Sequence, residues 1–168
     1  MMLLLVVRLL HIVAGAFWVG TIIVAVFFVE PTAKAFGATG ERFLAHLLFR
    51  QGLMPLLVGS ALVSITAGAI LYWMDSGGLG LAWITSPTGL GFTTGAVAAL
   101  AGFLIALVVL KPEFDRLATL TGDAPPERDH SAGLNEGRVR RWSLIQVTLL
   151  IIALAAMATA RYWPLVLG

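Results

Sequence analysis

The sequence contains no cysteine and few charged residues. Without cysteine the chain forms no disulfide, no thiolate metal site and no iron–sulfur cluster. Charged side chains make up 12% of its 168 residues and hydrophobic ones 59%, whereas a soluble domain has about 25% charged residues. This composition predicts an integral membrane protein. Any cofactor must then be held by histidine, methionine, carboxylates, backbone groups or shape.

The net charge of +2 gives no indication of a nucleic-acid partner. The first ten residues, MMLLLVVRLL, lack the basic region of a cleavable signal peptide, so we expect none. A chain of this length forms one compact unit. We therefore expect a single integral membrane domain over residues 1–168, surrounded by membrane lipids.

Four apolar runs are long enough to span a membrane, and they cover about residues 3–29, 53–74, 89–110 and 139–163. A hydrocarbon core of roughly 30 Å requires about 20 helical residues. The runs are continuous and do not alternate every second residue, which excludes a β-barrel. The sequence therefore predicts an all-α bundle of four transmembrane helices.

The segment between the first two runs contains helix-breaking and amphipathic features. Proline restricts the residue before it, so Glu30-Pro31 predicts a break after the first span. From Thr39 or Gly40 onward, the mixture of charged and apolar side chains predicts a short amphipathic helix that lies at the interface or leads into the second span. Between the second and third runs, residues 75–88 indicate a glycine-rich hairpin.

The basic residues are distributed unevenly among the connections. Nine of the eleven lie in the first and third connections or at the adjoining start of the fourth run, and only Arg8 and Arg161 lie on the opposite side. By the positive-inside rule, both termini face away from the cytoplasm. We therefore expect a multi-pass protein of a bacterial-type inner membrane. Residues 111–138 are expected to form an irregular cytoplasmic loop.

Small residues recur at spacings that allow helices to approach closely. These sets predict helix–helix contacts, and they are Ala16 with Gly20, Ser60 with Ser64 and Gly68, Gly91 with Gly95, and Ala98 with Gly102.

His11 is an ionisable residue inside the first apolar run. Such residues are expensive in a membrane, and their default interpretation is a functional site. Arg8, Gly15 and Trp18 lie on the same helical face as His11, at i−3, i+4 and i+7. His11 follows Leu3 by 8 residues, which corresponds to a depth of roughly 12 Å.

The fourth run has a comparable face near its outer end, with Met157 and Arg161 four residues apart. A b-type haem in a four-helix bundle needs an axial imidazole, accepts methionine as a second ligand, and needs cations for its propionates. We therefore predict haem b with His11 and Met157 as metal ligands. Predicted cofactor contacts are Arg8, Gly15, Trp18, Arg161 and Tyr162.

Other interpretations remain open. A membrane histidine can instead hydrogen-bond a serine, a threonine or a backbone carbonyl on another helix. Histidine with methionine also suits Cu(I), although the five methionines, Met1, Met2, Met54, Met74 and Met157, do not form a cluster. Arg8 and Arg161 could simply extend to lipid headgroups. Glu30 is a candidate partner for a cytoplasmic arginine, and His46 is expected to be solvated.

The motif from Arg8-Leu-Leu-His11 to Trp18-Val-Gly20 resembles the first helix of the copper-resistance D-like superfamily. This superfamily includes small membrane protoporphyrinogen IX oxidases, which are haem-b proteins. Two further stretches are similar to family motifs: Glu41-Arg42 with Met54-Pro55, and Leu134-Asn135-Glu136 without the family's following Pro-Thr. The resemblance implies that His11 ligates haem and that Arg8 is its basic neighbour.

The oxidases carry a lysine in their third helix, whereas residues 89–110 contain no charged residue. We therefore expect a haem protein of electron transfer, either a subunit of a redox complex or a homo-oligomer. One alternative is an enzyme of the protoporphyrinogen oxidase type. Another is a non-catalytic subunit that is structural or handles copper. Whether the protein is an enzyme stays open.

Overall fold

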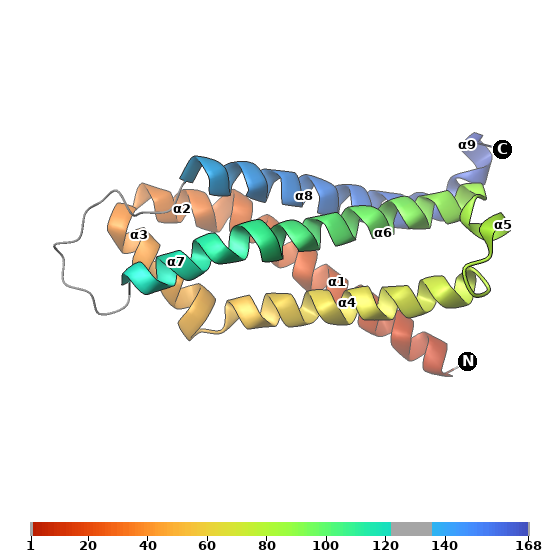
Figure 1. The fold of residues 1–168 in the computed structure, drawn as a ribbon, viewed down its shortest axis with the longest axis horizontal. Helices are drawn as coiled ribbons and strands as arrows, with labels where there is room; N and C mark the ends of the chain where they lie inside the picture. The colour runs from red at the N-terminus through yellow and green to blue at the C-terminus, as the bar shows by residue number, and fades with distance from the viewer. Residues whose placement is uncertain (1, 122–135, 168) are drawn as a thin grey trace.

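A computed structural model describes residues 2–121 and 136–167. Its four long helices form a bundle (Figure 1), and no strand occurs in these ranges. They are α1 (Met2–Val24), α4 (Leu53–Asp75), α6 (Pro87–Ile105) and α8 (Glu136–Thr159). The prediction of an all-α four-helix bundle is confirmed.

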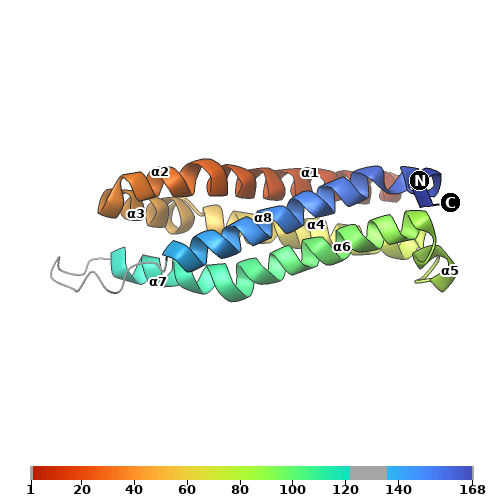
Figure 2. The same ribbon diagram turned by 90° about the horizontal axis from the view of Figure 1, so that it is seen from above.

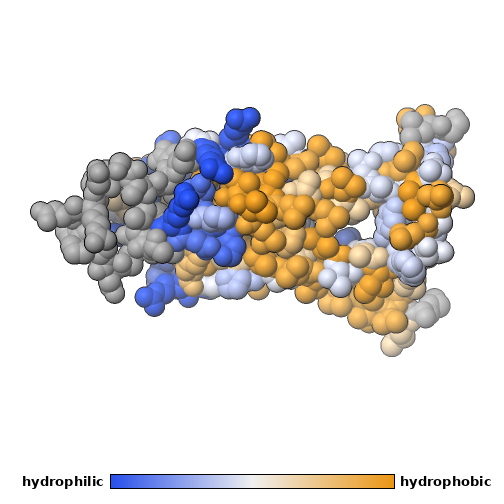
Figure 3. Space-filling view, viewed as in Figure 1, coloured by the Kyte–Doolittle hydropathy of each residue, from blue (hydrophilic) through white to orange (hydrophobic). Residues whose placement is uncertain are grey.

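The bundle has the length and surface of a multi-pass membrane protein. Four helical stretches are long and apolar enough to cross a membrane: Met2–Ala35, Leu53–Asp75, Pro87–Arg116 and Gly137–Tyr162. Figure 3 shows the apolar side chains as a broad belt, with strongly hydrophilic ones gathered near α7. We call this the α7 end, and the opposite end, near α5 and both termini, the α5 end.

The four long helices pack as two pairs, α1 with α4 and α6 with α8. At the α5 end the two pairs diverge (Figure 1), and Figure 3 shows the surface hollowed between them. Seen from above in Figure 2, α8 crosses between α1 and α6. The pairs join through the middle of the bundle, where Trp18 and Leu150 belong to one buried cluster.

The predicted break at Glu30-Pro31 is wrong. α1 continues through a π-helical turn, Ala25–Val29, into α2 (Glu30–Ala35), and Glu30 has helical dihedral angles. In the wide turn the backbone N–H of Glu30 donates to the carbonyl of Ala25, five residues earlier. A proline in a regular helix clashes with the carbonyl four residues earlier, and a π turn alters this register. Pro31 is accommodated because the helix widens before it.

The same arrangement precedes Pro112, so the predicted loop at 111–138 is wrong in its first part. The π-helical turn Ala106–Leu110 leads into α7 (Lys111–Thr121). Helix α7 is supported by the ion pair of Lys111 with Asp115, whose atoms are 2.6 Å apart, and by the buried ring of Phe114. Residues 122–135, which include His130 and the Leu134-Asn135 motif, lie outside the described residues.

The predicted amphipathic helix before the second span is confirmed as α3 (Gly37–Ala45). A π-helical turn, His46–Arg50, follows it, and Gly52, at φ 75°, begins α4. Leu44 of α3 packs with Ala33 and Phe114 in a buried cluster at the α7 end. At the α5 end, α5 (Leu81–Ile84) connects α4 to α6. The chain finishes with a 3₁₀ turn, Ala160–Tyr162, and α9 (Pro164–Leu167).

The small residues of α6 make the expected helix contacts, with α8 and with the 3₁₀ turn that follows it. A methyl group at Gly91 would lie 2.8 Å from Cβ of Ala160, and one at Gly102 3.3 Å from Leu150. The expectation for the first span is wrong, because Ala16 and Gly20 are exposed and a methyl group at Gly20 would meet nothing within 4 Å. That face of α1 points away from the other helices.

Candidate functional site

His11 is held by α4. Its Nδ1 atom lies 2.8 Å from the backbone carbonyl oxygen of Ser64. Because a carbonyl oxygen only accepts, Nδ1 carries the hydrogen, and in the neutral ring Nε2 is left with a free lone pair. The Ser64 hydroxyl donates in turn to the backbone carbonyl of His11 at 3.1 Å. The imidazole is therefore fixed in both orientation and tautomer.

Two glycines allow the helices to approach at this point. A methyl group at Gly68 would lie 2.9 Å from Cε1 of His11, and one at Gly15 would lie 2.9 Å from Oγ of Ser64. Gly15 thus makes room for α4 on the face that the sequence assigned to a cofactor. Ser64 and Gly68 were predicted to be packing residues, and their contact with His11 was not predicted. Their four-residue spacing on one face was the available signal.

The other predicted residues of α1 lie at different distances from this point. Arg8 is half-buried, one helical turn closer to the α5 end. Trp18 is only 4% exposed, and its ring forms an edge-to-face contact with Phe103 at 6.0 Å. Trp18 is therefore part of the core in the middle of the bundle, two turns from His11.

The predicted residues of the fourth span are not brought to His11. Met157 packs against α6, where a methyl group at Gly95 would lie 2.6 Å from its Cγ. Arg161 and Tyr162 are exposed in the last turn. Helices α1 and α8 diverge toward this end (Figure 1). The roles predicted for Met157, Arg161 and Tyr162 stay predictions, and the contacts described here give Met157 a packing role.

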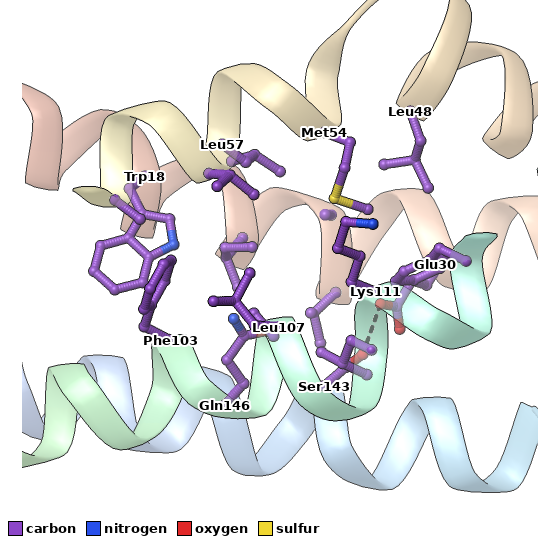
Figure 4. A pocket seen from close by; sticks show the side chains of 18 of the residues that line it. Trp18, Glu30, Leu48, Met54, Leu57, Phe103, Leu107, Lys111, Ser143 and Gln146 are labelled. Atoms are coloured by element: carbon purple, nitrogen blue, oxygen red, sulfur yellow. Dashed lines mark hydrogen bonds between the residues drawn. The ribbon is translucent and has the colours of Figure 1, made fainter. Parts of the chain in front are cut away.

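A second candidate site lies in the half of the bundle toward the α7 end. It is a cavity of about 80 Å³ between α1, α4, α6 and α8 (Figure 4). We call it the inner cavity. Most of its lining is apolar, and its polar or amphipathic lining residues are Trp18, Glu30, Lys111, Ser143 and Gln146.

Glu30 is anchored at one end of the inner cavity. The Ser143 hydroxyl donates to its carboxylate at 2.9 Å, and the Arg140 guanidinium lies 3.9 Å from the other carboxylate oxygen. Arg140 also donates to the backbone carbonyl of Val26 at 2.6 Å. The expected pairing of Glu30 with an arginine is confirmed. The pair joins α8 to the helix that follows α1.

Gln146 lies one turn beyond Ser143 along α8 and is 1% exposed. Its Nε2 atom has no hydrogen-bond partner among the described residues. A buried polar group left unpaired destabilises a protein by about 1–3 kcal/mol. In the sequence Gln146 shares a helical face with Met157, but it was not among the predicted site residues. The signal was an amide three residues after Ser143 in an otherwise apolar span.

The described residues contain no group of three or more histidine and carboxylate side chains that could hold a bare metal ion. A haem differs, because the porphyrin supplies four ligands and the protein needs to supply only the axial one. The imidazole of His11 fits that requirement. Comparison with protein families, with characterised proteins and with solved structures found no match for this chain.

Proposed function

We propose that this protein binds one b-type haem in the membrane through His11 and transfers electrons. The observation that carries the proposal is the 2.8 Å hydrogen bond from Nδ1 of His11 to the Ser64 carbonyl. Histidines that bind metals almost always donate their other ring N–H to a carbonyl or carboxylate, which fixes the tautomer and makes the ligating nitrogen more basic. His11 has this arrangement, with Nε2 as the candidate ligand.

The surroundings of His11 support the same proposal. The helix pairs diverge at the α5 end, where α1 begins (Figure 1), and the surface is hollowed there (Figure 3). Arg8, one turn farther out, is a suitable cation for a haem propionate because its planar guanidinium matches a carboxylate. When bound, haem supplies one-electron chemistry. The chain would hold it through His11, neutralise a propionate through Arg8, and keep water away with apolar helices.

The proposal includes an orientation. The α7 end carries most of the basic side chains, so we assign it to the cytoplasm and both termini to the opposite side. The membrane is then a bacterial-type inner membrane, and the haem lies in its outer half. Met157 is not required, since a single axial histidine suffices for haem binding.

The test is a reduced-minus-oxidised absorption spectrum of the protein purified from a haem-replete host. We expect a Soret band and an α-band at near-stoichiometric haem content. His11→Ala should abolish both. The matched control is His46→Ala, because His46 is exposed and far along the chain at the α7 end. Met157→Ala should leave the spectrum unchanged.

Two results would contradict the proposal. One is wild-type protein without haem, which would leave His11 as a packing residue bonded to Ser64. The other is haem retained by the His11→Ala variant. An assay of protoporphyrinogen IX oxidation then separates electron transfer from the enzyme alternative. We expect no turnover, because α6 carries no charged side chain.

A further inference from the structure

The inner cavity combines an apolar lining with a buried amide that has no partner. Gln146 is 1% exposed, and its Nε2 atom has no hydrogen-bond partner among the described residues. Figure 4 shows Gln146 pointing into the cavity and the indole nitrogen of Trp18 turned toward the same space. A buried amide without a partner is unfavourable. A ligand that carries a hydrogen-bond acceptor would remove that penalty.

The depth of Gln146 restricts the class of ligand. It follows Arg141, the last charged residue at the α7 end of α8, by five residues, so it lies roughly 7.5 Å deeper in the membrane than that arginine. The ester carbonyls of a phospholipid lie at the edges of a hydrocarbon core that is roughly 30 Å thick. A ligand for Gln146 therefore needs a carbonyl that can lie inside the hydrocarbon core, below the level of the lipid headgroups.

We propose that the inner cavity binds the head ring of an isoprenoid quinone, with a ring carbonyl accepting a hydrogen bond from Nε2 of Gln146. Quinones combine an apolar body with ring carbonyls and dissolve in the middle of a bilayer. Gln146 suits both redox forms, because an amide offers an N–H to a quinone carbonyl and a C=O to a quinol hydroxyl. The Trp18 indole N–H provides a second donor to the same space.

The inner cavity is too small to admit a quinone ring without a change in its lining. Its volume of about 80 Å³ is smaller than the roughly 150 Å³ cavity known to accept a benzene ring. A side chain must therefore move to admit a quinone ring. Met54 lines the cavity, and its unbranched, flexible side chain is the one most easily displaced. Truncating Met54 should favour binding.

The experiment measures binding of decylubiquinone to the purified full-length protein in nanodiscs, followed by quenching of tryptophan fluorescence. We expect saturable binding that Gln146→Leu weakens at least tenfold. Thr148→Val is the matched control, because Thr148 is exposed on the same helix and its hydroxyl bonds only within α8. This control should bind like the wild type, and Met54→Ala should bind more tightly.

Non-saturable quenching of the wild type would overturn the proposal. So would unchanged affinity in Gln146→Leu, or unchanged or weaker affinity in Met54→Ala. Thermal unfolding checks that each variant is folded. If Gln146→Leu does not fold, Met54→Ala still decides, because only a ligand in this cavity gains from its enlargement. The haem spectrum of the same samples is a separate readout. A protein that lacks haem and binds quinone contradicts the proposed function alone, and one with haem that fails to bind quinone contradicts this inference alone.

Discussion

Nδ1 of His11 and the backbone carbonyl of Ser64 form a 2.8 Å hydrogen bond that joins α1 to α4 inside the apolar part of the bundle. The Ser64 hydroxyl closes a second bond, at 3.1 Å, to the His11 carbonyl. Two helices are thus connected in both directions at one point. Because this connection uses only one of the two ring nitrogens, it supports the stability of the fold and leaves Nε2 for chemistry.

Replacing Gly68 by alanine should disturb His11 directly. The added methyl group would lie 2.9 Å from Cε1 and 3.0 Å from Nδ1 of the ring. The imidazole must then move, and its bond to Ser64 weakens. We expect a loss of about 1–3 kcal/mol in unfolding free energy, typical of overpacking, and altered haem absorption bands if His11 binds haem.

Gly59→Ala is the matched control for this change. Gly59 belongs to the same helix, and a methyl group there meets nothing within 4 Å. Alanine is the better helix former, so this variant should be as stable as the wild type or slightly more stable. Equal stability of the two variants in denaturant titrations would show that the contact of Gly68 with His11 is unimportant.

Contact between α6 and the 3₁₀ turn that follows α8 should depend on Gly91. A methyl group there would lie 2.8 Å from Cβ and 2.9 Å from Cα of Ala160, and the second of these is a backbone atom that cannot move easily. Gly91→Ala should therefore lower the unfolding free energy by about 1–3 kcal/mol. Gly20→Ala, on the exposed face of α1, should not lower it. Thermal unfolding in detergent compares the two, and a more stable Gly91→Ala protein would refute the packing described here.

Ser143 should stabilise the folded protein through its hydrogen bond to Glu30. The hydroxyl is 2.9 Å from the carboxylate, and Ser143 is only 1% exposed. Ser143→Ala removes this donor from a partly buried carboxylate. Hydrogen bonds to charged groups contribute about 1.5–3 kcal/mol, and we expect a destabilisation in that range by denaturant titration.

The control for Ser143 is Ser60→Ala. The Ser60 hydroxyl donates only to the Leu57 carbonyl of its own helix at 2.9 Å, so its loss should change stability by a few tenths of a kcal/mol. A Ser143→Ala protein as stable as Ser60→Ala would mean that Glu30 draws its support from Arg140 instead.

The sequence was sufficient to predict the number, positions and helical nature of the spans, because long apolar runs have few stable alternatives in a bilayer. The predicted helix break at Glu30-Pro31 and the predicted loop from Lys111 were wrong, because π-helical turns let the helices continue there. The proline rule describes a regular helix, and a local change in hydrogen-bond register cannot be read from composition.

The candidate sites were predicted less completely than the fold. His11 was recognised because an ionisable side chain in an apolar span is conspicuous, but its partners on α4 depend on how two helices pair. Gln146 is a candidate site residue only because its buried Nε2 atom has no hydrogen-bond partner among the described residues, and the sequence does not show this. Met157 was matched to His11 by its depth and by the arginine on its helical face, and neither feature reveals that the two helices diverge.

The orientation can be tested cleanly because the protein has no native cysteine. Asp75 is exposed at the α5 end and Thr32 at the α7 end. In intact cells, Asp75→Cys should react with a membrane-impermeant maleimide, whereas Thr32→Cys should react only after the membrane is permeabilised. The physical basis is that lysine and arginine near span ends are retained on the cytoplasmic side. Labelling of Thr32→Cys but not Asp75→Cys in intact cells would reverse the orientation and move His11 to the inner half of the membrane, where a haem would exchange electrons with cytoplasmic partners instead.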